Sequence, residues 1–295
     1  MPETGSQYVP PRFWRMYDRI HDYVKSEKNL RQCHPDMSFK ELVTTKLMPP
    51  RTDGSSTEDE QFTQFMMNYL YALPNGTEPN QLSAKLVNDY YQFKGEERFI
   101  NKGNGQICEV LAESGFPIVL STEAKAVHYS APGKVKLESK CGKIYEGDHL
   151  IVTLPLGVLK SGDVMFDPPL PKSKLAAIER LGISYLDKLF LEFEEVFWDP
   201  QVDLFNIIQD DWTLIVNCYK LHTRKPVLQL FNYGKQCQKY GKYSDEELVE
   251  SALEALRKVF QLETLPKVKS FLRTNWGDDK YAKGSYTYSA VGSHL

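Results

Sequence analysis

Four short apolar runs follow one another in the second half of the chain, with no helical stretch between them. In the first run, Leu189, Leu191 and Phe193 alternate with Lys188 and Phe190. This period of two predicts a β-strand with one buried face. Consecutive strands without intervening helices pair antiparallel, so the chain is expected to contain an antiparallel sheet. The other three predicted strands cover residues 204–208, 214–219 and 227–231.

Helical spacing marks the first hundred residues and two later segments. Apolar side chains recur every three or four residues after a Pro-Pro pair, which predicts an amphipathic helix with proline at its start. Ser38 with Glu41, and Ser244 with Glu247, have the spacing of a capping box, which marks a helix N-terminus. The predicted helices cover residues 13–24, 38–48, 62–70, 176–181 and 248–260.

Between residues 99 and 159 the apolar period changes to that of strands. Residues 99–100 are predicted to form a short strand that leads into a helix over 107–111, and Gly133 and Gly142 supply turns. The predicted strands at 118–120, 124–129, 135–137 and 150–154 form a small β-meander. The chain is therefore predicted to have an α+β fold, with helices packed on a mixed, largely antiparallel sheet.

Amino-acid composition restricts the class of protein, its partners and its cellular location. The chain has 295 residues, with 36 Lys and Arg against 39 Asp and Glu, and is 41% apolar and 25% charged. These values argue against wholesale disorder and against a polybasic nucleic-acid binder. No apolar run approaches the roughly 18 residues that span a bilayer, and the amino terminus lacks a signal-peptide pattern. We therefore expect an intracellular protein with no nucleic-acid or membrane partner.

Most familiar catalytic signatures are missing from the sequence. The five cysteines and six histidines show no metal-ligand spacing, so no metal site is predicted and the thiols are expected to be reduced. No serine lies in a Gly-x-Ser-x-Gly elbow. Gly103 and Gly105 are interpreted as a turn into a helix rather than a phosphate-binding loop, because Cys108 replaces the third glycine.

Two features of the second half suggest a ligand site, although each has a structural alternative. Lys188 interrupts an apolar strand, so it either reaches solvent from a strand edge, which its spacing favours, or is partly desolvated with a lowered pKa. The stretch from Trp276 to Tyr288 is rich in aromatic residues. Such rings form either the end of a core strand or the wall of a site for a flat, conjugated ligand.

These segments taken together resemble the flavin-containing amine oxidases, most closely the yeast polyamine oxidase branch. The matching features are Phe-Ile ahead of two glycines, a strand with Thr-x-Pro and Gly-Val-Leu, a lysine ahead of Glu-Phe-Glu, and the aromatic-rich stretch. They occur in the family's order at residues 99–105, 148–160, 186–198 and 276–288.

The resemblance implies FAD as the cofactor and a small amine of the spermine or spermidine type as the substrate. It implies that Lys188 is the catalytic lysine that holds a water near flavin N5. In the family, hydride transfer to the flavin gives an imine, water hydrolyses the imine, and dioxygen reoxidises the flavin with release of peroxide. The cofactor-binding residues implied in the same way are Ala124, Thr153, Pro155, Trp276, Tyr281 and Tyr286.

The resemblance also divides the chain. Residues 1–95 and 166–270 are expected to form the helical part and the sheet of a substrate domain. Residues 96–165 are expected to form part of an FAD-binding domain, and residues 271–295 the start of the return to that domain. Because the family's glycine-rich amino-terminal unit and its carboxyl-terminal FAD segment are not matched, we expect an incomplete form that binds FAD poorly by itself.

Other readings stay open from the sequence. A yeast relative is described as a corticosteroid-binding protein, so a non-catalytic binder of a steroid or another small ligand is one alternative, and an inactive fragment is another. The final Ser293-His294-Leu295 resembles a peroxisomal Ser-Lys-Leu signal. It also continues the family's internal sequence, so cytoplasmic residence is expected and peroxisomal residence is the alternative. No sequence feature indicates an oligomeric state.

Overall fold

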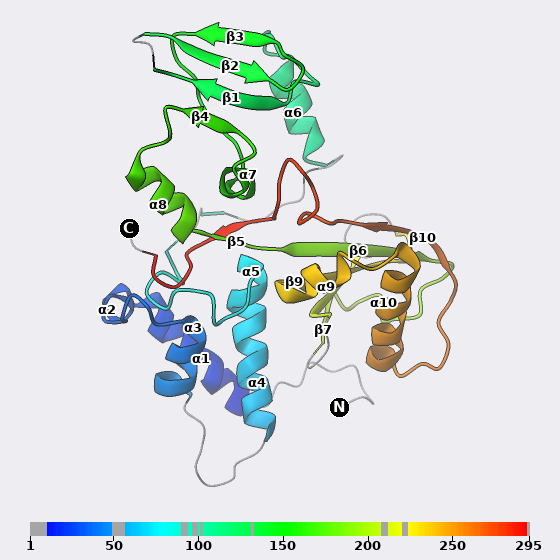
Figure 1. The fold of residues 1–295 in the computed structure, drawn as a ribbon. Helices are drawn as coiled ribbons and strands as arrows, with labels where there is room; N and C mark the ends of the chain where they lie inside the picture. Colours follow the sequence, from blue (N-terminus) through cyan, green and yellow to red (C-terminus); the bar gives the residue numbers. More distant parts are fainter. Residues whose placement is uncertain are drawn as a thin grey trace. The chain divides into compact units, whose positions relative to one another are not determined.

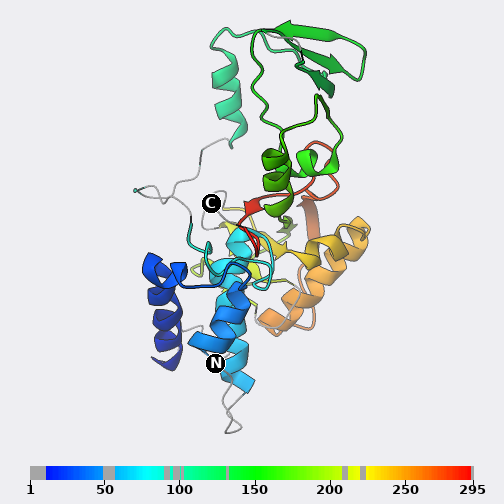
Figure 2. The ribbon, with the colours of Figure 1, turned by 60° about the vertical axis from the view of Figure 1, so that its left-hand side comes forward.

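The computed structural model describes residues 11–48, 57–89, 94–95, 100, 103–130, 133–207, 212–219 and 224–293. The chain separates into two compact units. Unit 1 comprises Met1–Asn88, Pro155–Lys160 and Ala176–Leu295, and unit 2 comprises Asp89–Leu154 and Ser161–Leu175. Figures 1 and 2 show the helices and strands of both units. Among the described residues, no helix has both the length and the apolar composition needed to cross a bilayer.

An antiparallel sheet with the strand order β10-β6-β9-β8-β7 forms the centre of unit 1. β6 (Leu186–Phe193) lies between β10 (Val268–Arg273) and β9 (Val227–Tyr233), as Figure 1 shows. β8 (Leu214–Asn217) and β7 (Leu204–Asn206) complete the sheet. The predicted antiparallel sheet is therefore confirmed, and β10 joins it as a strand that the sequence did not predict.

One face of this sheet packs against α10 (Asp245–Phe260), with α9 (Lys235–Tyr240) close by. Leu189 and Leu191 of β6 are buried in the same apolar cluster as Leu248 and Leu256 of α10. These β6 residues share one face because successive side chains in a strand point to opposite sides. Burial of four aliphatic side chains stabilises this contact by several kcal/mol, at about 1.5–3 kcal/mol each.

The other face of β6 packs against a helical segment from the first part of the chain. α4 (Thr57–Met67) continues into the π-helical segment η2 (Asn68–Ala72) and then α5 (Leu73–Asn75). Ala72 and Leu73 are buried together with Leu186 of β6 and Leu214 of β8. Lys188 is two residues from Leu186, so it lies on this second face of the sheet.

The remaining amino-terminal helices form their own core in unit 1. Ile20, Phe39, Leu42 and Met67 are among its fully buried side chains. The predicted helices are present here, and the Pro49-Pro50 pair that follows the second of them lies outside the described residues. The helices are α1 (Pro11–Lys25), α2 (Glu27–Arg31), α3 (Phe39–Leu42) and the π-helical η1 (Val43–Leu47).

Unit 2 is built on a sheet with the strand order β3-β2-β1-β4. β1 (Ala124–His128), β2 (Val135–Ser139) and β3 (Ile144–Gly147) form an antiparallel meander, and β4 (Met165–Asp167) pairs parallel to β1. α6 (Gly105–Ala112) precedes this sheet. α7 (Leu156–Ser161) and α8 (Lys172–Arg180) contain the points at which the chain passes between the units.

Two predicted strands of the meander are wrong. Residues 118–120 and 150–154 have no regular secondary structure, and Leu120 and Ile151 are 80% and 86% exposed. An apolar run becomes a strand only where another strand bonds to its backbone, and these two runs pair with no strand among the described residues. Phe99 and Ile208, which two other predicted strands include, lie outside the described residues.

Residues 271–295 were expected to begin the return to the FAD-binding domain, and that assignment stays a prediction. The structure groups these residues with unit 1. The physical reason is backbone pairing, since β10 bonds to β6 and β11 (Thr287–Tyr288) bonds to β5 (Gly182–Ile183). The assignment of the two units to substrate and cofactor domains stays a prediction.

Candidate active site

Lys188 lies in the middle of β6, opposite Phe231 of β9. Its side chain is half-buried, and Nζ lies 5.4 Å from the centroid of the Phe231 ring. In the described part of the chain, no carboxylate lies within ion-pair distance of this ammonium group. A lysine whose cation faces an aromatic ring instead of a carboxylate keeps its N–H donors available for water or a ligand.

Thr274 forms hydrogen bonds with the backbone of Lys188 on the β10 side of β6. The Lys188 amide donates to Thr274 Oγ1 at 2.9 Å, and the Thr274 amide donates to the Lys188 carbonyl at 3.0 Å. Thr274 follows the last residue of β10, so its hydroxyl continues the bonding of that strand to β6. The backbone at Lys188 is therefore held by β9 on one side and by Thr274 on the other.

The three aromatic residues named from the sequence lie on one loop of unit 1. Trp276, Tyr281 and Tyr286 are 43%, 55% and 46% exposed, so they are not part of the core. The loop closes on itself where the Gly284 amide donates to the Trp276 carbonyl at 2.9 Å. Exposed aromatic rings gathered on one loop favour the ligand-wall interpretation over the core-strand interpretation.

Both ends of this loop are attached to the strand that carries Lys188. At one end, Thr274 bonds to Lys188 as described above. At the other end, the Leu186 amide donates to Ser285 Oγ at 2.9 Å, and the Ser184 amide donates to the Tyr286 carbonyl at 2.8 Å. The structure therefore brings the loop that carries Trp276 and Tyr286 to the lysine strand.

Pro155 is exposed at the start of α7, where its carbonyl accepts hydrogen bonds from the Val158 and Leu159 amides at 3.0 and 3.1 Å. The same helix approaches the aromatic loop at Gly157. A Cβ atom at Gly157 would lie 2.6 Å from the Ala282 carbonyl oxygen, so only glycine fits there. Pro155 thus belongs to a helix that packs against the loop of Tyr281.

The two remaining sequence-predicted residues, Ala124 and Thr153, belong to unit 2. Ala124 is half-buried at the start of β1, opposite Ser139 of β2. Thr153 is exposed in the irregular stretch before Pro155. Unit 1 therefore contains Lys188, Pro155, Trp276, Tyr281 and Tyr286. The roles that the resemblance implies for these five residues, and for Ala124 and Thr153, all stay predictions.

The sequence analysis missed a buried carboxylate beside the lysine. Asp187 is 7% exposed, and its Oδ1 accepts hydrogen bonds from Thr274 Oγ1 at 2.8 Å and from the Trp276 amide at 3.0 Å. Cys237 lies behind it, and burial together with the nearby Asp187 charge raises the pKa of this thiol well above its ordinary value. No local pattern in the sequence indicated this burial, because the groups that bond to the carboxylate come from Thr274 and Trp276, far along the chain.

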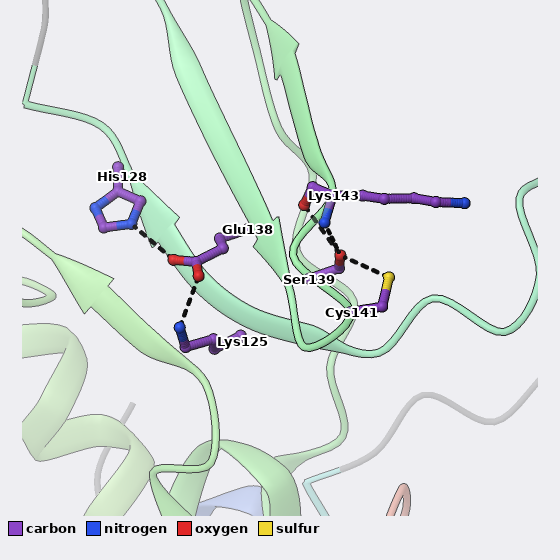
Figure 3. A network of polar contacts seen from close by, with 6 residues as sticks. All are labelled: Lys125, His128, Glu138, Ser139, Cys141 and Lys143. Carbon is purple, nitrogen blue, oxygen red and sulfur yellow. Dashed lines mark hydrogen bonds and ion pairs between the residues drawn. The ribbon is translucent and has the colours of Figure 1, made fainter.

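Unit 2 carries a separate polar network that the sequence did not indicate (Figure 3). Glu138 of β2 accepts a hydrogen bond from Lys125 Nζ at 2.6 Å and lies 3.8 Å from His128 Nε2. The bond from Lys125 lowers the pKa of Glu138. These residues are neighbours across β1 and β2, so their contacts follow from strand register.

The second half of the network centres on an exposed thiol, as Figure 3 shows. The Ser139 hydroxyl lies 3.2 Å from Cys141 Sγ and also accepts the Lys143 amide at 2.9 Å. The contact with Ser139 is the main cause of a lowered pKa for Cys141. Within the described residues, no group of three or more His, Cys, Asp or Glu side chains is placed to hold a metal ion.

Comparison with known proteins identifies the family to which this arrangement belongs. Residues 38–295 match the family model of flavin containing amine oxidoreductases. The chain belongs to this family. FAD is therefore the cofactor that the family implies.

Similar curated proteins differ in their named substrates. The chain is 35% identical over 212 residues to "Lysine-specific histone demethylase 1 homolog 1" of Oryza sativa subsp. japonica, a match that covers 70% of this chain and 25% of the relative. It is 31% identical over 274 residues to the human "Peroxisomal N(1)-acetyl-spermine/spermidine oxidase", covering 80% of this chain and 54% of the relative. The chain thus matches about a quarter to a half of the length of these relatives.

Solved structures share the fold. Wild-type putrescine oxidase bound to putrescine superposes with a TM-score of 0.75 at 16% identity, over 97% of this chain and 67% of that chain. The fold class predicted from the sequence, α+β with helices on a largely antiparallel sheet, is confirmed by this likeness. At this level of identity the comparison establishes the fold alone.

Proposed function

We propose that this chain acts in the FAD-dependent oxidation of amines, with polyamines of the spermine type as the substrate class. One observation carries the proposal. On β6, a half-buried lysine that has no ion-pair partner among the described residues lies beside the points where a loop of exposed aromatic rings is hydrogen-bonded to the same strand. The family membership supports FAD as the group that these residues serve.

The residues of unit 1 fit a flat conjugated cofactor. Trp276 and Tyr286 expose ring faces on which an isoalloxazine can stack, and Lys188 supplies N–H donors from the neighbouring strand. Bound FAD supplies the two-electron acceptor chemistry that no amino-acid side chain provides. Lys188 is proposed to hold and orient a water molecule of the kind that hydrolysis of the oxidised amine requires.

The aromatic loop also suits a cationic amine. Lys280 Nζ lies 4.4 Å from the centroid of the Tyr281 ring, so an ammonium group already occupies a position over this ring. Cation–π contacts of this kind are worth about 0.5–1 kcal/mol at exposed sites and more where water is excluded. We propose that the amino groups of the substrate use the ring faces of this loop in the same way.

The named activities of the relatives suggest two classes of amine. Polyamine oxidation is supported by the similarity to the spermine/spermidine oxidase, and lysine demethylation by the similarity to the histone demethylase. We favour polyamines because the four collinear segments of the sequence resemble the polyamine oxidase branch, and the substrate comparison below decides between the two classes. The comparisons lend no support to a steroid-binding function.

The test is a substrate comparison on the purified protein supplied with FAD. Because weak FAD binding is expected, bound FAD is first measured by equilibrium dialysis over a range of FAD concentrations that reaches saturation. Its reduction at saturating FAD is then followed under anaerobic conditions with spermine, N1-acetylspermine, putrescine and a methyl-lysine histone peptide. The expected result is reduction by at least one polyamine and none by the peptide. Bound FAD that no amine reduces, or that the peptide reduces faster than every polyamine, contradicts the proposal.

We also propose cytoplasmic residence. Ser293 is 4% exposed, and its hydroxyl donates to the Arg180 carbonyl at 3.2 Å, which is unlike the free end that a peroxisomal receptor reads. His294 and Leu295 lie outside the described residues. A fluorescent protein fused to the amino terminus is expected to be diffuse in the cytoplasm. Punctate peroxisomal fluorescence that disappears on deletion of Leu295 would show the opposite.

A further inference from the structure

We propose that Asp187 and Thr274 are positioning residues that fix Trp276 relative to Lys188, and that this pair sets the rate of amine oxidation without touching the substrate. The inference rests on the proposed function and adds two residues to the site. Neither was indicated by the sequence.

Thr274 joins Lys188 to the carboxylate of Asp187. Its hydroxyl oxygen accepts the Lys188 amide at 2.9 Å, and the hydroxyl proton is donated to Asp187 Oδ1 at 2.8 Å. A hydroxyl can do both at once because it has one donor and two acceptor lone pairs. A methyl group in place of this hydroxyl would break both bonds and leave the Lys188 amide without this partner.

The same oxygen of Asp187 holds the start of the aromatic loop. Oδ1 accepts the Trp276 amide at 3.0 Å, so the backbone of Trp276 is bonded to this atom directly. The backbone of Lys188 is bonded to the same atom through Thr274 Oγ1. Hydrogen bonds to an ionised acceptor are about twice as strong as neutral ones, and Asp187 is shielded from water. The distance between the backbones of Trp276 and Lys188 is therefore set by three hydrogen bonds that meet at Thr274 Oγ1 and Asp187 Oδ1.

Asp187 itself has little room to move. On its far side, Cys237 is 4% exposed and its thiol donates to Asn232 Oδ1 at 2.8 Å. The cavity that Asp187, Lys188, Asn232, Cys237 and Thr274 help to line measures about 10 Å³, which is no larger than the space of a single water. A carboxylate enclosed in this way keeps its position while the exposed rings respond to a ligand.

The proposed positioning residue Asp187 and the proposed catalytic residue Lys188 lie on opposite faces of β6. Asp187 and Lys188 are consecutive in β6, so their side chains point to opposite faces of the sheet. Asp187 faces the α9 side together with Cys237, and Lys188 faces Phe231. Asp187 and Thr274 therefore act through the backbone of Lys188 and Trp276, and not by direct contact with the amine.

The experiment compares Thr274→Val, which keeps the shape and removes the hydroxyl, with Thr274→Ser, which keeps the hydroxyl. Ser270→Ala is the matched control, because Ser270 also lies on the β10 side and its hydroxyl bonds to a β6 carboxylate, Glu192, at 3.1 Å. Hydrogen exchange at the Lys188 and Trp276 amides shows whether the bonds are broken. Thermal melting reports the effect on stability, and anaerobic stopped-flow reports flavin reduction by the polyamine that reduces the parental protein.

In Thr274→Val we expect faster exchange at both amides and about a 10-fold to 100-fold lower limiting rate of flavin reduction, the size of loss that a misplacement of about 1 Å produces. The amine concentration for half-saturation is expected to change little, and Thr274→Ser is expected to restore the rate. A Thr274→Val protein with faster exchange or a lower melting temperature but the parental reduction rate would show a structural role only, and would overturn the inference. If no amine reduces the flavin of the parental protein, the proposed function is wrong. This result differs from the one that would overturn the positioning role of Thr274, so the two claims are tested separately.

Discussion

Lys188 is the residue on which the proposed chemistry depends most directly. Substitution by Met keeps the unbranched shape beside Phe231 and removes the ammonium group. We expect Lys188→Met to slow amine-dependent flavin reduction by about 10²-fold or more, the usual size of a lost proton-transfer or water-holding group. Anaerobic stopped-flow on the FAD-loaded protein measures this rate.

Lys269→Met is the matched control for that variant. Lys269 is exposed on β10, so the same substitution there removes an equal charge at a site outside the proposed machinery. The control is expected to reduce its flavin at the parental rate and to keep its FAD content. Equal rates of flavin reduction in Lys188→Met and the parental protein would show that Lys188 has a structural role only.

Gly157 gives a second prediction at the scale of one residue. A Cβ atom there would lie 2.6 Å from a backbone oxygen of the aromatic loop, and backbone cannot swing away as a flexible side chain does. Gly157→Ala is expected to destabilise the protein by about 1–3 kcal/mol, as overpacking commonly does. Urea unfolding measures the change. Gly105→Ala, where no atom lies within 4 Å, is expected to leave stability unchanged or slightly raised, and a similar loss in both variants would refute the explanation.

Residues differ in how far the sequence predicts them. Lys188 stood out because it broke an apolar alternation, and the exposed aromatic loop stood out by composition. Asp187 did not, because the two residues that bond to it lie 87 and 89 positions further along the chain. A local pattern carries no information about partners at that separation, so the positioning pair became visible only in three dimensions.

At the scale of elements, α10 shows local signals and tertiary packing in agreement. Its capping box is present, since the Glu247 amide donates to Ser244 Oγ at 3.2 Å and the Ser244 amide donates to the Glu247 carboxylate at 2.8 Å. Ser244→Ala is expected to cost about 1 kcal/mol, the typical value of a lost N-cap. Thermal or urea unfolding measures the difference. Glu247→Gln keeps an acceptor and is expected to cost less, and an equal loss in both variants would contradict the capping explanation.

Elements whose stability is local were predicted, and those that depend on distant partners were not. The helix α10 and the strands β6, β8 and β9 were evident from period and capping. β10 was missed because its burial pattern does not alternate cleanly, and most of its residues are exposed. The runs at 118–120 and 150–154 were assigned as strands from apolar character alone, which does not supply a pairing partner.

At the scale of the whole molecule, unit 2 exposes an unusual amount of apolar surface. α6 buries none of its residues, and Phe116, Ile118, Leu120 and Ile151 are all exposed. Exposed apolar patches bind hydrophobic dyes and promote association. We expect the protein to enhance the fluorescence of 1-anilinonaphthalene-8-sulfonate, and the double variant Ile118→Glu, Leu120→Glu to enhance it much less.

A charge control keeps that prediction specific. Ser114→Glu adds a negative charge at an exposed polar position of the same unit and removes no apolar side chain. It is expected to leave the dye signal unchanged. A signal that falls equally in both proteins would trace the effect to repulsion of the anionic dye, and the apolar-surface explanation would then be abandoned.

The aromatic loop is attached to the rest of unit 1 in a way that would allow part of it to be exchanged. Its two ends are bonded to β6 through Thr274 and Ser285, and the Gly284 amide closes it onto Trp276. Away from residues 282–283, whose carbonyl oxygens approach Gly157, the loop can be lengthened at little entropic cost, because doubling a loop adds only about 0.6 kcal/mol of closure entropy. We therefore expect that exchanging residues 277–281 would change the proposed amine preference while the strand that carries Lys188 stays as it is.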